Sequence, residues 1–471
     1  MSHSRRDFLR HTACALGSFA LASQIENFGV VHALTPQAAT DYKALVMVFL
    51  NGGNDGNQMF LDLNQYSAYA GNGSALTRSG AGLAIPQANF LPVSPVSGGS
   101  FGFHPNMPEV QSLFNSGKLA VLCNNGPLVE PLTKTQYQGS GKKPLQLFSH
   151  SDQVGQYSSA IANAISQTGW GGRLADKTNG LNGGATFPSN VSINGVNLYL
   201  TGVDTRQLAV ADSGTSLANV LVLSDAPSAT TAEKASRLAA FNQIRSFDNG
   251  FKLIKASSDM RSSAIQTDNA LSSVNPTLTT TFPNTSLGRQ LKQVALLMKA
   301  CTDVSAGINM KRQIFFTQIG GFDTHSQQLS GQGSLMQQLS QAINAFFSAT
   351  TELGLQDKVT LFTMSDFSRT LQPSGTGAAD VGSDHAWGNN HLIVGGSVLG
   401  HTLYGTYPNI TPGGANDTDS GSNPRGRWIP TTSVEQYAAT LASWYGMSSA
   451  DMTSVFPLIG RFPSSNLGFL S

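Results

Sequence analysis

The sequence predicts an α/β fold in which helices sandwich a doubly wound, mainly parallel sheet. First, several short runs have the apolar, β-branched composition of buried strands. These runs cover residues 44–50, 119–123, 313–319 and 359–364. Second, helix and strand patterns alternate in the second half of the chain, which is typical of right-handed βαβ crossovers. Third, acidic residues follow three of the strands, at the edge where open parallel sheets bind ligands.

The first strand is the continuous apolar run Ala44–Leu50, which reads as a central strand covered on both faces. A turn over residues 51–56 follows it and places Asp55 just past its carboxyl end. The turn lacks the G-x-G-x-x-G pattern and has no Lys-Ser/Thr after it, which argues against a nucleotide loop. We therefore interpret Asp55 as a metal ligand or part of an anion site.

A helix over residues 109–116, ended by Gly117, precedes the second strand at 119–123. Further along, Ser149, His150, Ser151 and Asp152 occur together at a predicted helix start. Such residues can cap a helix, hold an anion against its N–H groups, or supply a hydroxyl nucleophile. Capping alone requires neither a histidine nor two serines, which favours a functional role.

Residues 178–285 are rich in Ser, Thr and Gly and carry the weakest pattern. They contain short β-like pieces and a polar helical stretch from about residue 232 to 264. We interpret this segment as an insertion, or cap, over the sheet, where substrate selectivity could lie.

The pattern sharpens with an amphipathic helix at 286–299 and the strand at 313–319. The chain turns at Gly320 and Gly321 and then delivers Asp323 and His325 onto a loop. A carboxylate oxygen and an imidazole nitrogen together suit a divalent metal ion. A helix at 334–353 leads to the next strand.

The strand at 359–364 ends in Ser365 and Asp366, so Asp366 is expected at the same edge as Asp55 and Asp323. A Gly-rich loop then brings Asp384 and His385. Residues 392–396 form a last short strand, and helices at 432–445 and 452–456 close the sandwich.

The N-terminus has the form of an export signal. Arg5 and Arg6 precede Phe8-Leu9 in a close match to the twin-arginine pattern, and a short apolar run follows. Residues 1–33 are the predicted signal peptide, with an alternative cleavage site near Ala39. The expected partner is the twin-arginine export machinery, which carries folded proteins, and the expected location is the periplasm or the exterior. No later apolar run reaches membrane-spanning length, so no stable membrane anchor is expected.

The composition narrows the range of partners. Charged residues make up 12% of the 471 residues and the formal net charge is +1, which gives no electrostatic case for nucleic acid. Cys14 would leave with the signal peptide. Cys123 and Cys301 remain, either as one disulfide or as buried thiols, and no cysteine pair has metal-ligand spacing.

Six motifs resemble, in order, an exported bacterial family called domain of unknown function 1501. They are Leu50–Gly56, Ser149–Asp152, Gly169–Arg173, Gly320–His325, Ser365–Arg369 and Asp384–Gly388. The likeness runs over residues 44–462, which implies a single domain of the alkaline phosphatase and sulfatase superfamily. It implies acids and histidines at the strand ends but brings no established activity. Phe367 stands where that superfamily has a histidine after the aspartate, which leaves one metal site short of a ligand.

On this framework Asp323, His325 and His385 make one metal site, for which Zn²⁺ or Mn²⁺ is favoured. Asp55 and Asp366 make a second, all-oxygen site. Two ions about 4 Å apart would clamp a phosphoryl or sulfuryl group. Asp384 is either a further ligand or the partner that orients His385.

The catalytic candidates come from two motifs. Ser149 or Ser151 supplies the nucleophile, and His150 acts as an acid or base. Arg369 or Arg173 either binds the oxyanion or forms a buried ion pair.

Two function classes follow, with a third in reserve. The first is a metal-dependent hydrolase acting on small anionic esters, phosphate or sulfate. The alternative is a non-catalytic exported binding or assembly protein that retains the hydrolase fold. A purely structural surface protein fits the Gly/Ser/Thr-rich composition but leaves the acids and histidines unexplained.

Overall fold

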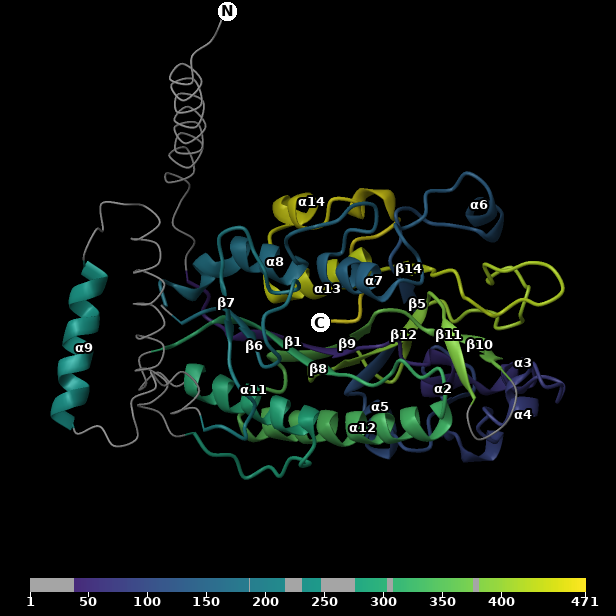
Figure 1. The fold of residues 1–471 in the computed structure, drawn as a ribbon, viewed down its shortest axis with the longest axis horizontal. Coiled ribbons are helices and arrows are strands. Elements are labelled where there is room, and N and C mark those ends of the chain that lie inside the picture. The colour runs from purple at the N-terminus through teal and green to yellow at the C-terminus, as the bar shows by residue number, and fades with distance from the viewer. Residues whose placement is uncertain (1–37, 186, 217–230, 247–275, 303–307, 376–380) are drawn as a thin grey trace, which may run out of the picture.

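A large mixed sheet with helices on both faces forms the centre of the molecule (Figure 1). The computed structural model describes residues 38–185, 187–216, 231–246, 276–302, 308–375 and 381–471. In order across the sheet, the strands are β13 (Leu403–Gly405), β5 (Leu119–Gly126), β12 (Asn389–Val394), β9 (Val359–Ser365), β1 (Lys43–Leu50), β8 (Arg312–Ile319), β6 (Asn190–Ser192) and β7 (Gln207–Ala209). Strand β14 (Thr432–Ser433) also pairs with β5. The predicted α/β class is confirmed. The predicted signal peptide lies outside the described residues.

Strand β1 (Lys43–Leu50) lies in the middle of the sheet because its side chains are apolar on both faces. It pairs in parallel with β8 (Arg312–Ile319) on one side and β9 (Val359–Ser365) on the other. Leu50 is opposite both Ile319 and Ser365, so the three carboxyl ends are level. The loops that follow these strands therefore meet at one edge.

Strand β12 (Asn389–Val394) runs antiparallel between β9 and β5 (Leu119–Gly126). Because its direction is reversed, β12 begins at the edge where β9 ends, and the segment before it reaches the same place. That segment contains β11 (Gly382–His385), which forms a two-stranded ribbon with β10 (Arg369–Ser374). Two short strands, β13 (Leu403–Gly405) and β14 (Thr432–Ser433), pair in parallel with β5.

The opposite edge is formed by β6 (Asn190–Ser192) and β7 (Gln207–Ala209), both parallel to β8. These residues fall within the predicted insertion at 178–285, yet they belong to the sheet and not to a cap over it. Strands of three residues are too short to show a periodic pattern. The polar helical stretch expected from about residue 232 is represented by α9 (Thr231–Ser246), and the rest of it lies outside the described residues.

Two helical layers cover the sheet (Figure 1). One contains α5 (Pro108–Asn115), α11 (Ser286–Thr302) and α12 (Gln328–Glu352). The other contains α7 (His150–Ser159), α8 (Trp170–Thr178), α13 (Val434–Tyr445) and α14 (Met452–Val455). Side chains of β1 alternate between them: Val46 and Val48 join the first core, Met47 and Phe49 the second. Each fully buried side chain of this size contributes about 1.5–3 kcal/mol.

Residues between β1 and α5 form a small antiparallel sheet of β2 (Phe60–Asp62), β4 (Phe101–Phe103) and β3 (Leu91–Val93). This excursion also carries the short helices α3 (Tyr66–Ala70) and α4 (Arg78–Ala81). It matters for the site because it supplies Arg78.

Cys123 and Cys301 are buried and unpaired, which resolves the choice between a disulfide and buried thiols. Burial raises the pKa of the Cys301 thiol to about 12 and that of Cys123 further, so neither is reactive at neutral pH. Within the described ranges, no helix has the length and apolarity needed to cross a membrane.

Candidate metal centre

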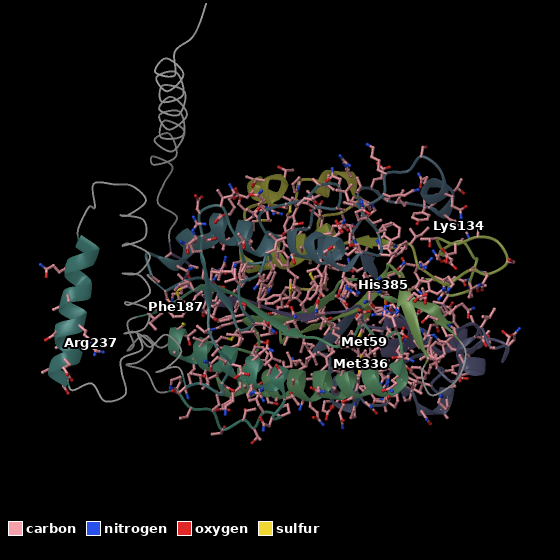
Figure 2. All side chains as sticks on the ribbon, viewed as in Figure 1. Met59, Lys134, Phe187, Arg237, Met336 and His385 are labelled. Atoms are coloured by element: carbon pink, nitrogen blue, oxygen red, sulfur yellow. The ribbon has the colours of Figure 1, made fainter. Side chains whose placement is uncertain are left out.

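Four side chains converge at the edge where β8 and β9 end: His150, Asp323, His325 and His385. Oδ1 of Asp323 lies 3.0 Å from Nε2 of His325, 3.4 Å from Nε2 of His150 and 3.5 Å from Nε2 of His385. The Nε2 atoms of His325 and His385 are 3.2 Å apart. Figure 2 places His385 beside β11, close to the strand ends. Oδ1 of Asp323 is thus the common neighbour of three imidazole nitrogens.

Each of the four comes from an element that the sheet positions. Asp323 and His325 lie on the loop after β8, where Gly321 adopts a φ of 101° that L side chains rarely accept. A Cβ atom at Gly52 would collide with the backbone nitrogen of Asp323, so the loop after β1 can approach only because residue 52 is glycine. His150 is the first residue of α7 and His385 the last of β11.

Each histidine has its Nδ1 atom next to an oxygen acceptor. Nδ1 of His150 is 2.6 Å from Oδ2 of Asp366, and Nδ1 of His385 is 2.8 Å from the carbonyl oxygen of Phe148. Nδ1 of His325 is 3.4 Å from Oδ1 of Asp384. An acceptor at Nδ1 favours the tautomer whose Nε2 lone pair is free, the arrangement found around metal-bound histidines.

Asp366 is a partner of His150 and does not join the converging atoms. Its carboxylate is buried and accepts the backbone N–H groups of Gly52 at 2.8 Å and Gly53 at 3.0 Å. The next residue, Phe367, packs against the rings of His150 and His385, with ring centres 4.6 and 4.5 Å away. The phenyl ring of Phe367 therefore supports two of the imidazoles.

The electrostatics favour the ligand forms of two of these groups. Partial burial raises the pKa of Asp323, but the hydrogen bond and charge of Arg369 and the nearby histidines outweigh it and lower the pKa to about 2. Burial lowers the pKa of His385, so its imidazole is neutral at neutral pH. The hydrogen bond to Asp366 raises the pKa of His150.

The donor set fits a divalent transition metal. Zinc–nitrogen bonds of about 2.0–2.1 Å in a tetrahedron place ligand atoms roughly 3.3 Å apart, and the four separations above are 3.0–3.5 Å. His150, Asp323 and His385 offer atoms that all lie within 4.8 Å of one another. Nε2 of His150 is buried and has no hydrogen-bond partner, which is costly unless it binds something there.

Asp55 does not join this cluster, and the expected all-oxygen pair of Asp55 with Asp366 is not formed. Oδ2 of Asp55 lies 2.6 Å from Nη2 of Arg78 and accepts Nε2 of Gln328 at 2.7 Å. Oδ1 caps α2 (Gly56–Met59) by accepting the N–H of Asn57 at 3.0 Å. The carboxylate is fully buried and both oxygens are engaged.

Neither candidate arginine is placed to bind an oxyanion. Arg369 is fully buried and donates to Asp323 and to backbone carbonyls of the loops around it. These carbonyls belong to Gly52, Gly53, Phe322 and Ser383. Arg173 donates to the carbonyls of Ser159 and Val455, which ties α7, α8 and α14 together. Both guanidinium groups organise the fold around the site.

The two candidate nucleophiles are engaged elsewhere. Oγ of Ser149 lies 2.6 Å from Oδ2 of Asp152, Oγ of Ser151 lies 3.3 Å from the same oxygen, and the hydroxyls are 3.2 Å apart. This network closes the first turn of α7, which leaves His150, between the two serines, as the residue of this motif that enters the cluster.

Several residues that hold the predicted site residues in place carried no recognisable sequence pattern. Arg78 lies in the excursion after β2, and Gln328 opens α12 earlier than the sequence predicts. Arg425 donates to Oδ2 of Asp384 at 2.7 Å. Asp384 consequently sits between Arg425 and His325, whereas His385 is oriented by Phe148, whose φ of 70° no local pattern predicts.

Comparison with known families agrees with the resemblance of the motifs. A family model described as "Protein of unknown function (DUF1501)" matches residues 42–419. The chain belongs to this family. A search of curated proteins finds no match to this DUF1501 member.

Several solved structures are similar to this DUF1501 chain in part. The PsFucS1 sulfatase from Pseudoalteromonas sp. has 9% identity and a TM-score of 0.30, covering 95% of this chain and 72% of that one. A mutant of the alkaline phosphatase PafA has 12% identity and a TM-score of 0.25, with 71% and 64% covered. A mutant TAB5 alkaline phosphatase with bound Mg has 10% identity and a TM-score of 0.26, with 79% and 96% covered. TM-scores this low support no inference about chemistry from these structures. The chemistry of the candidate centre is therefore inferred from this chain's own side chains.

Proposed function

We propose that this protein is a metal-dependent hydrolase of small anionic esters, phosphate or sulfate, with one divalent ion as its centre. The observation that carries the proposal is that Oδ1 of Asp323 lies within 3.5 Å of three Nε2 atoms, and that His150, Asp323 and His385 offer ligand atoms all within 4.8 Å of one another. Two of these imidazoles, His150 and His385, have a hydrogen-bond acceptor at Nδ1. Three nitrogens and one oxygen favour Zn²⁺ or Mn²⁺ over Ca²⁺.

The protein's own groups would divide the work as follows. His150, His325, His385 and Asp323 would hold the ion, which when bound supplies a Lewis acid that polarises an ester oxygen. Asp366 and the Phe148 carbonyl keep two of the imidazoles in the required tautomer. The side chains of Asp323 and His325 are about half exposed, at 48% and 49%, which supports access for a substrate from solvent.

A specific observation also favours the second candidate, a non-catalytic binding or assembly protein that uses the same centre. If His325 joins His150, Asp323 and His385, four protein ligands complete a tetrahedral sphere, as in structural zinc sites, whereas catalytic sites keep one position open. In addition, the hydroxyls of Ser149 and Ser151 are held by Asp152, and Arg369 is engaged by carbonyls.

The test begins with protein folded inside the cell and purified without chelators. Metal analysis is expected to give one divalent ion per chain, and a panel of aryl phosphate and sulfate esters is expected to give turnover. The activity should disappear after chelation, return with Zn²⁺ or Mn²⁺, and be absent from His385→Ala.

The outcomes separate the two candidates. One bound ion with no turnover on the whole panel would replace the hydrolase by the binding protein. A chain that contains no ion, and binds none on titration, would rule out both.

A further inference from the structure

Residues 411–427 form a loop, here named the arginine loop, that is closed by a buried carboxylate. Asp417 is fully buried, and its two oxygens accept four backbone N–H groups at 2.9–3.0 Å. The donors are those of Gly413, Asp419, Gly426 and Arg427. Both ends of the loop are thereby tied to one side chain.

Two arginines of this loop contact residues that flank the proposed metal centre. Nε of Arg427 donates to the carbonyl oxygen of His385 at 3.0 Å. Its guanidinium group also lies 5.0 Å from the centre of the ring of Phe148, the residue whose carbonyl oxygen contacts Nδ1 of His385. Arg425 holds Asp384, which is next to Nδ1 of His325. The loop thus supports the partners of two of the three histidines.

Lys134, in α6 (Lys134–Gln138), holds the other side of the loop. Its Nζ atom donates to three backbone carbonyls of the loop, those of Gly413 at 2.7 Å, Gly414 at 3.1 Å and Asp419 at 2.6 Å. An ammonium group has three donors, and these three carbonyls use all of them. Figure 2 shows Lys134 beside this loop, away from the sheet.

A second side chain of α6 holds the same loop. Nε2 of Gln138 donates to the carbonyl oxygen of Thr418 at 3.2 Å and to Oγ of Ser420 at 2.5 Å. Residues four apart lie on one face of a helix, so α6 presents Lys134 and Gln138 together. The carboxylate of Asp419 continues the connection, since both its oxygens lie 3.2 Å from Nη1 of Arg427.

We propose that Lys134 is a positioning residue for the metal centre: its ammonium group holds the arginine loop against Asp384 and His385. The inference rests on the proposed metal centre and adds a determinant of its affinity that lies outside the cluster. Replacing the partners of metal-bound histidines typically weakens metal binding about 10–100-fold. Because Lys134 acts through Arg427, the lower end, about tenfold, is expected for its loss.

The test compares metal titrations of the full chain and three variants, Lys134→Met, Gln138→Ala and Lys143→Met. Methionine keeps the length of the stem but removes the charge and the donors. Lys143→Met is the matched control, since that ammonium lies 4.9 Å from the centre of the Tyr137 ring of the same helix. In the described part of the chain it makes no hydrogen bond to the arginine loop.

Lys134→Met and Gln138→Ala are expected to bind Zn²⁺ about tenfold more weakly than wild type, and Lys143→Met equally well. The visible spectrum of the Co²⁺-loaded protein should change in the first two, because the geometry at His385 relaxes. The melting temperature of the metal-free protein should change little, and amide exchange should rise at Gly426 and Arg427.

Wild-type affinity in both Lys134→Met and Gln138→Ala would overturn this inference and leave the proposed function standing. The same would follow if Lys143→Met lost as much affinity as they did. If the wild type itself bound no ion, the proposed function and this inference would both fall.

Discussion

At the scale of single residues, the proposed metal centre depends on the group that contacts Nδ1 of each imidazole. Asp366 is fixed by the backbone N–H groups of Gly52 and Gly53, and it fixes His150 in turn. Nδ1 of His150 contacts the carboxylate of Asp366, and Nδ1 of His385 contacts the carbonyl oxygen of Phe148. Nδ1 of His325 lies near the carboxylate of Asp384. These partners make the ligands act as a set, because each Nε2 is aimed before an ion arrives.

The first prediction follows from this set. Removing any one of Asp323, His325 or His385 by alanine should abolish tight Zn²⁺ or Mn²⁺ binding nearly as fully as removing all three. Each supplies one ligand to a single coordination sphere, so the losses do not add. Isothermal titration of metal ion into protein stripped of metal by a chelator measures the affinity. His150→Ala should lose affinity in the same way.

His401→Ala is the control for this series. His401 lies in a turn with a φ of 56°, and its ring packs against Phe114. His391 is a poorer control for titration, since it is fully buried against Tyr157 and Tyr437. Unchanged stoichiometry and affinity in both His325→Ala and His385→Ala would show that no metal site exists here.

The second prediction concerns the buried pair of Arg78 and Asp55. Arg78→Met should lower the free energy of unfolding by about 3–5 kcal/mol, because it leaves a buried carboxylate without its counterion. Metal stoichiometry should stay the same, since Asp55 is not part of the cluster. Denaturant unfolding gives the first quantity and metal analysis the second.

Arg289→Met provides the comparison, because Arg289 pairs with Asp212 at 2.9 Å with both side chains partly exposed. Such a pair contributes about 0–1 kcal/mol. Equal losses of stability in the two variants would contradict the role assigned to the Arg78–Asp55 pair. A loss of bound metal in Arg78→Met would show that Asp55 contributes to metal binding.

At the scale of elements, α13 contains a titratable group that the site does not use. Glu435, in the first turn, is buried; Oε1 accepts the N–H of Leu458, and Oε2 has no partner. Burial raises the pKa of Glu435 to about 8, although the Leu458 hydrogen bond and the charges of Arg173 and Arg461 act against it. The carboxyl group is therefore protonated in the folded protein at neutral pH.

The third prediction is a pH dependence of stability. The folded state holds its proton on Glu435 up to about pH 8, whereas an unperturbed glutamate releases it near 4.5. The stabilising contribution is complete below about pH 4.5 and is lost as the pH rises to about 8, at about 1.4 kcal/mol per pKa unit. Glu435→Gln should flatten the stability profile over this range.

Denaturant unfolding at several pH values measures this effect, with Glu130→Gln as the control because Glu130 is a partly exposed loop residue. A wild-type profile as flat as that of Glu435→Gln would show that Glu435 is ionised in the folded protein.

Elements with a strong local pattern were predictable as strands of the sheet, whereas the short β-like piece at 191–193, which overlaps β6, was assigned to an insertion. The runs at 44–50, 313–319 and 359–364 correspond to β1, β8 and β9 within one residue, because strands buried on both faces require continuous apolar sequence. Strands β6 and β7 have three residues each; β6 forms because β8 offers it a parallel partner, and β7 pairs in parallel with β6. No window of sequence contains that cause.

At the scale of the whole molecule, the candidate site was predictable where it follows from the strand ends. Asp323, His325 and His385 come together because β8 and β9 end level and β12 starts at the same edge. Asp55 occupies an equivalent place in the chain, but its environment depends on Arg78 and Gln328, which reach it from distant segments. The position of Asp55 after a strand predicted that it lies at this edge of the sheet. The direction of its carboxylate depends on packing against residues from other segments.

The fourth prediction concerns export. Replacing Arg5 and Arg6 by a lysine pair should retain the protein in the cytoplasm, since the twin-arginine pattern requires both guanidinium groups. Fractionation of cells followed by immunoblotting measures it, with Arg10→Lys as the control. Normal export of the paired-lysine variant would contradict the twin-arginine interpretation. Normal export of Arg10→Lys together with retention of the paired-lysine variant would support it.

The place of β1 in the sheet also constrains how the chain is made. Tyr42 bonds to Gln313 across 271 residues, and Leu50 accepts a hydrogen bond from Ser365 across 315. The strand at the centre of the sheet is thus among the first to leave the ribosome and cannot find either neighbour until most of the chain has been translated. Contacts this distant make folding slow and leave an apolar strand unpaired during synthesis. The exposure of this strand during synthesis follows from its place in the sheet, whatever the stability of the finished fold.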